Sequence, residues 1–267
     1  MIPKDRATVI LVVDVSRSMQ ARDVKPSRLA AATAAVRVFL ERVPKRLQVG
    51  LIAFAGDPAV AAPPTSDHAL VREALDTLEW YPSFGGTAIG DALAAAVRLG
   101  QQATGVEGNL ASVETAPPTP TRGLVSILFL SDGAQTRGEL LPLDGADRAR
   151  VAGIPVYTVA LGTARGTLRF KFSRPPGGFP GPNPFGPGRS VPVPPDPNTL
   201  RAIANRTGGE FFAARDSKSL NAAYSKLGSR LGRRPGKTEV TYGFLAGAAG
   251  LLLAAGLLSA LWSPRLP

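Results

Sequence analysis

The chain has 267 residues, 44% hydrophobic and 6% aromatic, which is enough for one domain with a substantial core plus appended segments. It has no cysteine and a single histidine, which excludes disulfides, thiolate chemistry and Cys/His zinc sites, so any bound metal ion must be held by oxygen. The formal net charge of +11 is compatible with nucleic acid, an anionic membrane or acidic partners, and does not choose among them. The lone His68 lacks a catalytic partner, and we expect it at the surface without a role.

Strand and helix patterns alternate along the chain. The β-branched run at residues 8–13 is typical of a central parallel strand buried on both faces. A helix begins at Ser27 and ends before Pro44. Further strands are expected at residues 49–54, 124–130, 156–161 and 210–213, and further helices near residues 70–78, 89–97, 144–152, 197–207 and 217–231.

This succession predicts an α/β fold in which a doubly wound, mostly parallel sheet carries helices on both faces, because parallel strands need right-handed crossovers. Residues 101–122 are loop-like. Repeated proline and glycine at residues 174–197 indicate an insertion without regular structure. We expect no signal peptide before the domain, since the apolar run at residues 7–13 is short and leads directly into a polar motif.

Residues 242–262 form an uncharged apolar stretch of about 21 residues, the length that a helix needs to cross a bilayer. A buried core helix would show a polar stripe, and this stretch has none. Tyr242 and Trp262 stand at its two ends, where aromatic rings favour the headgroup region. The sequence therefore predicts a domain at residues 1–231, a basic linker at 232–241, a transmembrane helix at 242–262 and a tail at 263–267.

The basic residues gather just before this stretch, at Lys226, Arg230, Arg233, Arg234 and Lys237. No aromatic residues interleave there to stack on bases, so we expect no nucleic-acid partner. A basic flank is instead typical of a membrane anchor, and it favours the cytoplasmic side for the domain.

A polar motif begins where the first strand ends. Asp14, Ser16 and Ser18 form a D-x-S-x-S pattern, which places a carboxylate and two hydroxyls on one tight loop. Ligands of open α/β sheets bind beyond the carboxyl ends of the strands, and Mg²⁺ takes oxygen ligands while keeping several waters. Two further segments are expected at the same edge, G-G-T at residues 85–87 and F-L-S-D-G at residues 129–133. Alone, the first motif is equally compatible with serines that only cap a helix.

Together and in this order, the three segments resemble the metal-ion-dependent adhesion site of von Willebrand factor type A domains, over residues 7–231. The resemblance implies a Rossmann-like fold with a metal ion held by Asp14, Ser16, Ser18, Thr87 and Asp132. Serine hydroxyls would bind the ion, the threonine would do so directly or through water, and the carboxylates would hold coordinated waters. An Asp or Glu of a partner protein would complete the shell of Mg²⁺, or alternatively of Mn²⁺ or Ca²⁺.

The whole chain resembles bacterial membrane-anchored type A domain proteins related to aerotolerance operons. Those proteins usually begin with two additional membrane helices, which would favour export of the domain, and the sequence from Met1 shows none, so the side of the membrane stays open. We expect a non-enzymatic, cation-dependent binding module at a cell membrane. A Mg²⁺-dependent phosphoryl-transfer enzyme and a structural membrane protein without a ligand at the site remain as alternatives.

Overall fold

The computed structural model describes residues 7–78, 86–105, 121, 124–169, 190–214, 216 and 255. The chain forms two compact units, Met1–Gly232 and Arg233–Pro267, and the description below concerns the first. The predicted last helix and the basic cluster lie outside the described residues, as does the predicted membrane span except for residue 255. Within the described ranges, no helix is both long and apolar enough to cross a bilayer.

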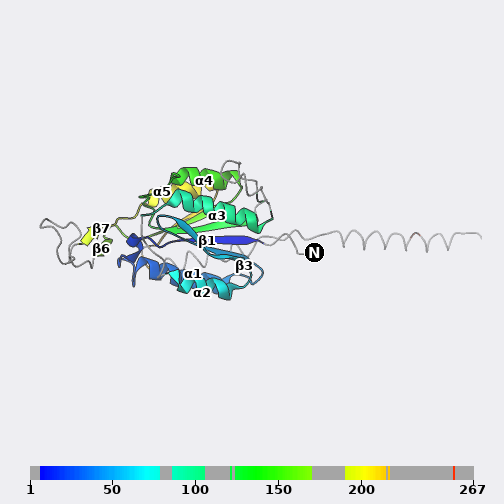
Figure 1. Cartoon of the computed structure of the whole chain (residues 1–267), viewed down its shortest axis with the longest axis horizontal. Helices are drawn as coiled ribbons and strands as arrows, with labels where there is room; N and C mark the ends of the chain where they lie inside the picture. Colours follow the sequence, from blue (N-terminus) through cyan, green and yellow to red (C-terminus); the bar gives the residue numbers. More distant parts are fainter. Residues whose placement is uncertain are drawn as a thin grey trace, which may run out of the picture. The chain divides into compact units, whose positions relative to one another are not determined.

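A six-stranded sheet forms the centre of the first unit, in the order β3-β2-β1-β4-β5-β8 (Figure 1). Neighbouring strands are parallel, except that β3 runs antiparallel to β2. The predicted mostly parallel sheet is therefore confirmed. The strands are β1 (Thr8–Asp14), β2 (Gln48–Phe54), β3 (Pro58–Thr65), β4 (Val125–Ser131), β5 (Val156–Leu161) and β8 (Phe211–Ala214).

Helices cover both faces of the sheet (Figure 1). Successive side chains of β1 point to opposite faces, so Val9 and Leu11 pack with one helix layer while Ile10 and Val12 pack with the other. This double cover explains why every residue of β1 is buried. One layer contains α1 (Arg28–Arg42) and α2 (His68–Asp76), and the other contains α3 (Ile89–Ala103), α4 (Pro142–Val151) and α5 (Pro197–Thr207).

The edge strand β3 was not predicted from the sequence. Its run P-A-V-A-A-P-P-T contains three prolines, which lack the N–H group of a regular ladder and speak against a central strand. An edge strand tolerates them because one side of it needs no partner.

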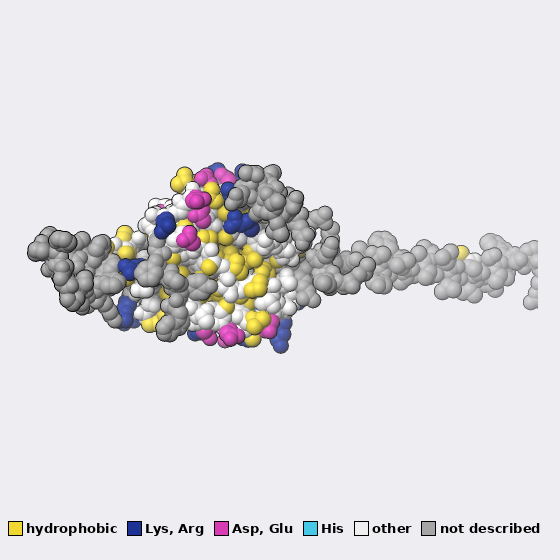
Figure 2. Space-filling view, viewed as in Figure 1, with side chains coloured by type: hydrophobic (Ala, Val, Ile, Leu, Met, Phe, Trp, Pro, Cys, Tyr) yellow, Lys and Arg dark blue, Asp and Glu magenta, His cyan; other side chains and the backbone are white. Residues whose placement is uncertain are grey.

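Figure 2 shows one face of the domain in space-filling form. Hydrophobic side chains gather across the middle of the face in view, with charged side chains above and below them.

Two further expectations were wrong. The segment at residues 174–197 was expected to lack regular structure, yet β7 (Ser190–Pro192) pairs with β6 (Thr167–Arg169) in a short antiparallel hairpin. Its pairing partner lies outside the segment, so proline and glycine content could not reveal it. His68 is buried rather than at the surface, with Nε2 2.8 Å from the carbonyl oxygen of Leu47.

The chain order of the strands creates a crevice at the carboxyl end of the sheet. From β1 the chain goes to β2 on one side, whereas β4 takes the place on the other side, so the connections of β1 and β4 leave in opposite directions. Val13 of β1 lies opposite Leu130 of β4 in the register. The residues that follow these two strands therefore meet at a switch point, the usual place for a ligand.

We expect Phe129→Ala to lower the free energy of unfolding by about 3–5 kcal/mol, because the ring is fully buried and its removal leaves a cavity. Its centroid lies 5.0 Å from that of Phe54, across the strands that carry the site. Urea denaturation measures the change. Leu70→Ala, at an exposed position of α2, is the control and should change stability by no more than about 0.5 kcal/mol. Equal losses in the two variants would contradict this account of the core.

Candidate metal site at the carboxyl end of the sheet

Asp14 ends β1 and is completely buried. Its Oδ1 accepts the backbone N–H of Ser16 at 2.8 Å, and its Oδ2 accepts the hydroxyl of Ser131 at 2.5 Å. Both carboxylate oxygens are thus engaged by the protein, one by its own loop and one by the neighbouring strand. Asp14 organises the loop that follows it.

Ser16 and Ser18 lie on this loop, with their Oγ atoms 2.9 Å apart. Ser16 occupies the N-cap position of the short 3-10 helix η1 (Arg17–Gln20), but its side chain makes no capping hydrogen bond. A serine whose only role is to cap a helix would use its hydroxyl there. The capping interpretation therefore does not fit, and two hydroxyls face one another at the end of β1.

Asp132 follows β4 and is almost completely buried. Its Oδ2 accepts a hydrogen bond from Arg28 at 3.0 Å. Among the described residues, no donor reaches its buried Oδ1 with normal hydrogen-bond geometry. A buried oxygen in this state is rare and calls for an unseen partner such as an ion or water.

Thr87 is buried just before α3, on the loop that the sequence analysis expected at this edge. Its backbone exchanges hydrogen bonds with Thr136, which accepts from Thr87 N through Oγ1 at 3.0 Å and donates its own N–H to Thr87 O at 3.1 Å. The next residue, Ala88, donates to Ala55 at the end of β2. The structure therefore ties Thr87 to the loop after Asp132 through its backbone.

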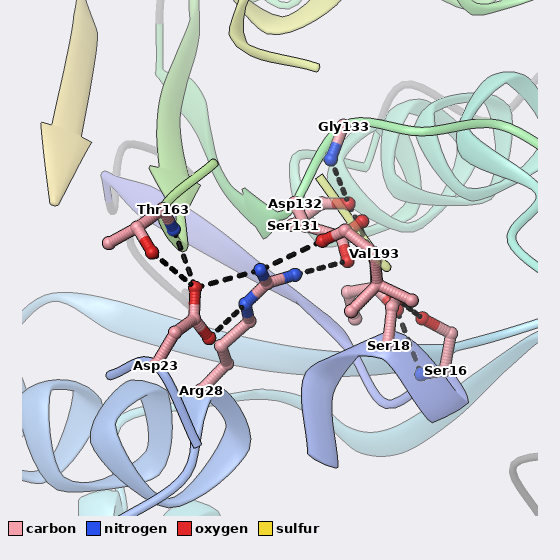
Figure 3. A network of polar contacts seen from close by, with 10 residues as sticks. Ser16, Ser18, Asp23, Arg28, Ser131, Asp132, Gly133, Thr163 and Val193 are labelled. Atoms are coloured by element: carbon pink, nitrogen blue, oxygen red, sulfur yellow. Dashed lines mark hydrogen bonds and ion pairs between the residues drawn. The ribbon is translucent and has the colours of Figure 1, made fainter. Parts of the chain in front are cut away.

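The sequence analysis missed Arg28, Asp23 and Ser131. Figure 3 shows the guanidinium of Arg28 between Asp23 on one side and Asp132 on the other. Ser131 bridges the loops, since it donates to Asp14 and its Oγ accepts the N–H of Gly133 at 2.9 Å. Ser131 stands in the F-L-S-D-G motif, so the signal was present. An arginine at the start of a helix, by contrast, carries no sign of burial.

Burial shapes the electrostatics of the site. Burial, and after it the nearby charge of Asp132, raise the pKa of Asp14 to about 7. Burial also raises the pKa of Asp132, although Ser18 and Arg28 counteract it. For Asp23, burial is outweighed by hydrogen bonds from Arg28 and Thr163, and its pKa is lowered. Two carboxylates beside one another in a buried place favour either a shared proton or a cation.

The donor set suits a hard divalent cation. The described residues hold no cluster of three or more His, Cys, Asp or Glu side chains, so a site built only from such groups is not found among them. The loops after β1 and β4 instead combine two hydroxyls with one carboxylate oxygen that has no hydrogen bond within the described part of the chain. Oxygen ligands of this kind, supplemented by water, suit Mg²⁺.

Comparison with known proteins identifies the family. The profile of the von Willebrand factor type A domain matches residues 9–134, a span that includes Asp14, Thr87 and Asp132. A UPF0353 protein of Mycobacterium tuberculosis is 33% identical over 271 residues, covering 100% of this chain and 72% of the relative. The chain is a von Willebrand factor type A domain protein of the UPF0353 family. Type A domains commonly act in metal-dependent protein interactions.

Solved structures share the type A fold. An aerotolerance-related membrane protein from Bacteroides fragilis aligns with a TM-score of 0.63 and 22% identity, over 85% of this chain and 100% of that protein. The proximal thread matrix protein 1 of the mussel byssus, solved with zinc in its MIDAS motif, aligns with a TM-score of 0.53 and 18% identity, over 85% of this chain and 48% of that protein. At these identities the likeness concerns the fold.

The raised pKa of Asp14 predicts how the metal-free domain responds to pH. Between its ordinary value of 3.8 and about 7, the folded state holds a proton that the unfolded state has lost. Stability should therefore fall as the pH rises through this window. Asp14→Asn removes the titrating group and should flatten the dependence, as measured by urea unfolding in chelator. Parallel pH curves for the two proteins would show that the burial of Asp14 is not what sets the dependence.

Proposed function

We propose that this chain is a divalent-cation-dependent protein-binding module, in which Ser16, Ser18, Thr87 and Asp132 hold the ion and Asp14 fixes the loop and the waters around it. The observation that carries the proposal is Oδ1 of Asp132, which is buried and has no hydrogen-bond partner among the described residues, together with the paired hydroxyls of Ser16 and Ser18. The residues that carry these oxygens follow β1 and β4, the strands that flank the switch point, and the hydroxyl of Ser16 makes no capping hydrogen bond, which supports the proposal.

Mg²⁺ is the ion that we propose, with Mn²⁺ and Ca²⁺ as alternatives. Mg²⁺ accepts a small number of protein ligands and keeps waters in its shell. This matches a site with two hydroxyls and one carboxylate oxygen that no donor in the described ranges satisfies. The mussel protein shows that a type A fold can hold zinc in its MIDAS motif. Here the donor chemistry is oxygen throughout, which favours a harder ion.

The partner would supply an Asp or Glu side chain to the ion. Both oxygens of Asp14 are already engaged, and one oxygen of Asp132 is held by Arg28, so the site brings little negative charge into direct contact with the ion. An ion held mainly by neutral hydroxyls and water keeps most of its charge. It then attracts an acidic side chain from outside, and binding depends on the metal.

A binding role is favoured over phosphoryl transfer. Type A domains are generally interaction modules. The single histidine of the sequence, His68, bonds to Leu47 at the amino end of β2, whereas the site lies at the carboxyl end, about 20 Å along the strand. His68 cannot reach a substrate there as a general base.

We further propose that residues 242–262 anchor the module in a cell membrane. The stretch has the length and the apolar character of a spanning helix, with Tyr242 and Trp262 at its ends. The similar Bacteroides fragilis protein is described as an aerotolerance-related membrane protein. The site would then be presented at a membrane surface.

Combined Ser16→Ala and Ser18→Ala should abolish metal-dependent partner capture. The immobilised full chain in detergent should retain an acidic protein partner from membrane extracts in Mg²⁺ and release it in chelator, and the double variant should retain none. Proteomics of the eluates measures the difference. Loss of the two hydroxyls should leave folding intact, because neither serine belongs to the hydrophobic clusters that pack against the sheet and the hydroxyl of Ser16 makes no capping hydrogen bond.

Ser66→Ala is the matched control, since Ser66 is exposed in the turn after β3, at the opposite end of the sheet. It should retain the partner like the unaltered chain. Retention that is equal in Mg²⁺ and in chelator would argue against a metal-dependent module. Hydrolysis of phosphate esters that depends on Mg²⁺ and is lost in Asp14→Ala would replace binding by catalysis.

Deletion of residues 242–267 should move the protein from the membrane fraction to the supernatant. The physical reason is the loss of an uncharged apolar stretch, residues 242–262, that is long enough to span a bilayer. Ultracentrifugation after lysis, followed by immunoblotting, measures the partition. If the full chain stays in the supernatant after lysis, the proposed membrane anchor is wrong, and the proposal for the metal site is unaffected.

A further inference from the structure

Arg28, the first residue of α1, is completely buried. Its guanidinium donates four hydrogen bonds: to both carboxylate oxygens of Asp23, at 2.9 Å each, to the carbonyl oxygen of Val193 at 2.9 Å, and to Oδ2 of Asp132 at 3.0 Å. Burying a charged group is costly even when it is paired, so stability alone is a weak reason for such a residue. Its contacts point instead to the candidate metal site.

Two glycines make room for this guanidinium. A methyl group on Gly162 would lie 2.5 Å from Cζ of Arg28, and one on Gly166 would overlap Nη2. Both glycines follow β5, at the same end of the sheet as Asp132. The backbone of this loop is thus fitted to the planar head group of an arginine.

Arg28 determines which oxygen Asp132 offers. A carboxylate that can rotate presents its two oxygens equally, but here Oδ2 is held by Arg28 and Oδ1 is left without a hydrogen bond among the described residues. Figure 3 shows Asp132 and Ser18 on the same side of the guanidinium, away from Asp23. The hydroxyl of Ser18 is also near enough to Asp132 to lower its pKa.

The same guanidinium ties the site to the β6–β7 hairpin. Asp23 accepts two hydrogen bonds from Arg28. It also accepts hydrogen bonds from the backbone N–H of Thr163 at 2.6 Å and from the hydroxyl of Thr163 at 3.1 Å. Val193 directly follows β7, and its N–H donates to Gly166, just before β6, at 2.9 Å. The guanidinium of Arg28 therefore contacts both the base of the hairpin and the carboxylate of Asp132.

We propose that Arg28 is the positioning residue of the metal centre: it fixes Asp132 with Oδ1 toward the ion and transmits occupancy of the site to the base of the β6–β7 hairpin. This inference rests on the proposed function, because it requires a cation at Ser16, Ser18 and Asp132.

A positioning role of Arg28 and a purely electrostatic role predict different effects of substitutions on metal binding. If Arg28 acted only through its field, its positive charge would repel the ion, and a variant that keeps the charge would bind as before. Arg28→Lys keeps the charge, but one ammonium group cannot reproduce the planar fork that joins Asp23 to Asp132. Gly166→Ala leaves every charge in place and displaces the guanidinium by its methyl group. The φ of Gly166 is not positive, so alanine fits the backbone there.

The test measures binding of Mn²⁺ to the detergent-solubilised full chain by electron paramagnetic resonance, in which the signal of free Mn²⁺ is lost on binding. Arg28→Lys and Gly166→Ala should each weaken binding by about 10- to 100-fold, as is typical for residues that orient metal ligands. Arg37→Lys is the control. Arg37 lies on the same helix as Arg28 and forms an exposed ion pair with Asp76 of α2, so this variant should bind Mn²⁺ like the unaltered chain.

Hydrogen exchange supplies a readout that a merely structural role would not move. Adding Mn²⁺ or Mg²⁺ to the unaltered chain should slow exchange of the Thr163 and Val193 amides, and the effect should be absent in Gly166→Ala. If Arg28→Lys does not fold, Gly166→Ala decides. Undiminished Mn²⁺ affinity in folded variants would overturn the role of Arg28 and leave the metal site standing. An unaltered chain that binds no Mn²⁺ would overturn the proposed function and this inference with it.

Discussion

Two carboxylates, Asp14 and Asp132, are buried next to one another at the ends of the neighbouring strands β1 and β4. In a low-dielectric interior such a pair cannot carry both charges without compensation. The compensation comes from N–H and hydroxyl donors around Asp14, from Arg28 beside Asp132, and, in the function that we propose, from a divalent cation. Much of the loop structure at this end of the sheet follows from this requirement.

The layered arrangement of the fold brings the two carboxylates together. Because the sheet is covered on both faces, β1 and β4 are apolar through their middle residues and polar at their carboxyl ends. Parallel strands then bring Asp14 and Asp132 together, although more than a hundred residues separate them in the sequence. The loop before α3 joins the same edge through the paired backbone contacts of Thr87 and Thr136.

Local patterns sufficed to predict the parallel strands and the helices α1 to α5, because buried parallel strands and polar loops have different compositions. They failed for β3, whose prolines oppose a strand that only an edge position permits, and for β7, whose partner β6 lies beyond the segment judged. Arg28 was missed for a deeper reason: a lone arginine in sequence looks solvated, and only the tertiary fold supplies Asp23, Asp132 and Val193 around it.

The prolines of β3 also limit how other proteins can approach this domain. Many partners add a strand to an exposed sheet edge and are held by its backbone N–H groups. Pro63 and Pro64 have none to offer, and the register of β3 against β2 is already irregular there. Addition of a strand to this edge through backbone hydrogen bonds is therefore disfavoured, both for a foreign peptide and for a second copy of the chain. This edge of the sheet is therefore a poor docking site for an extended strand.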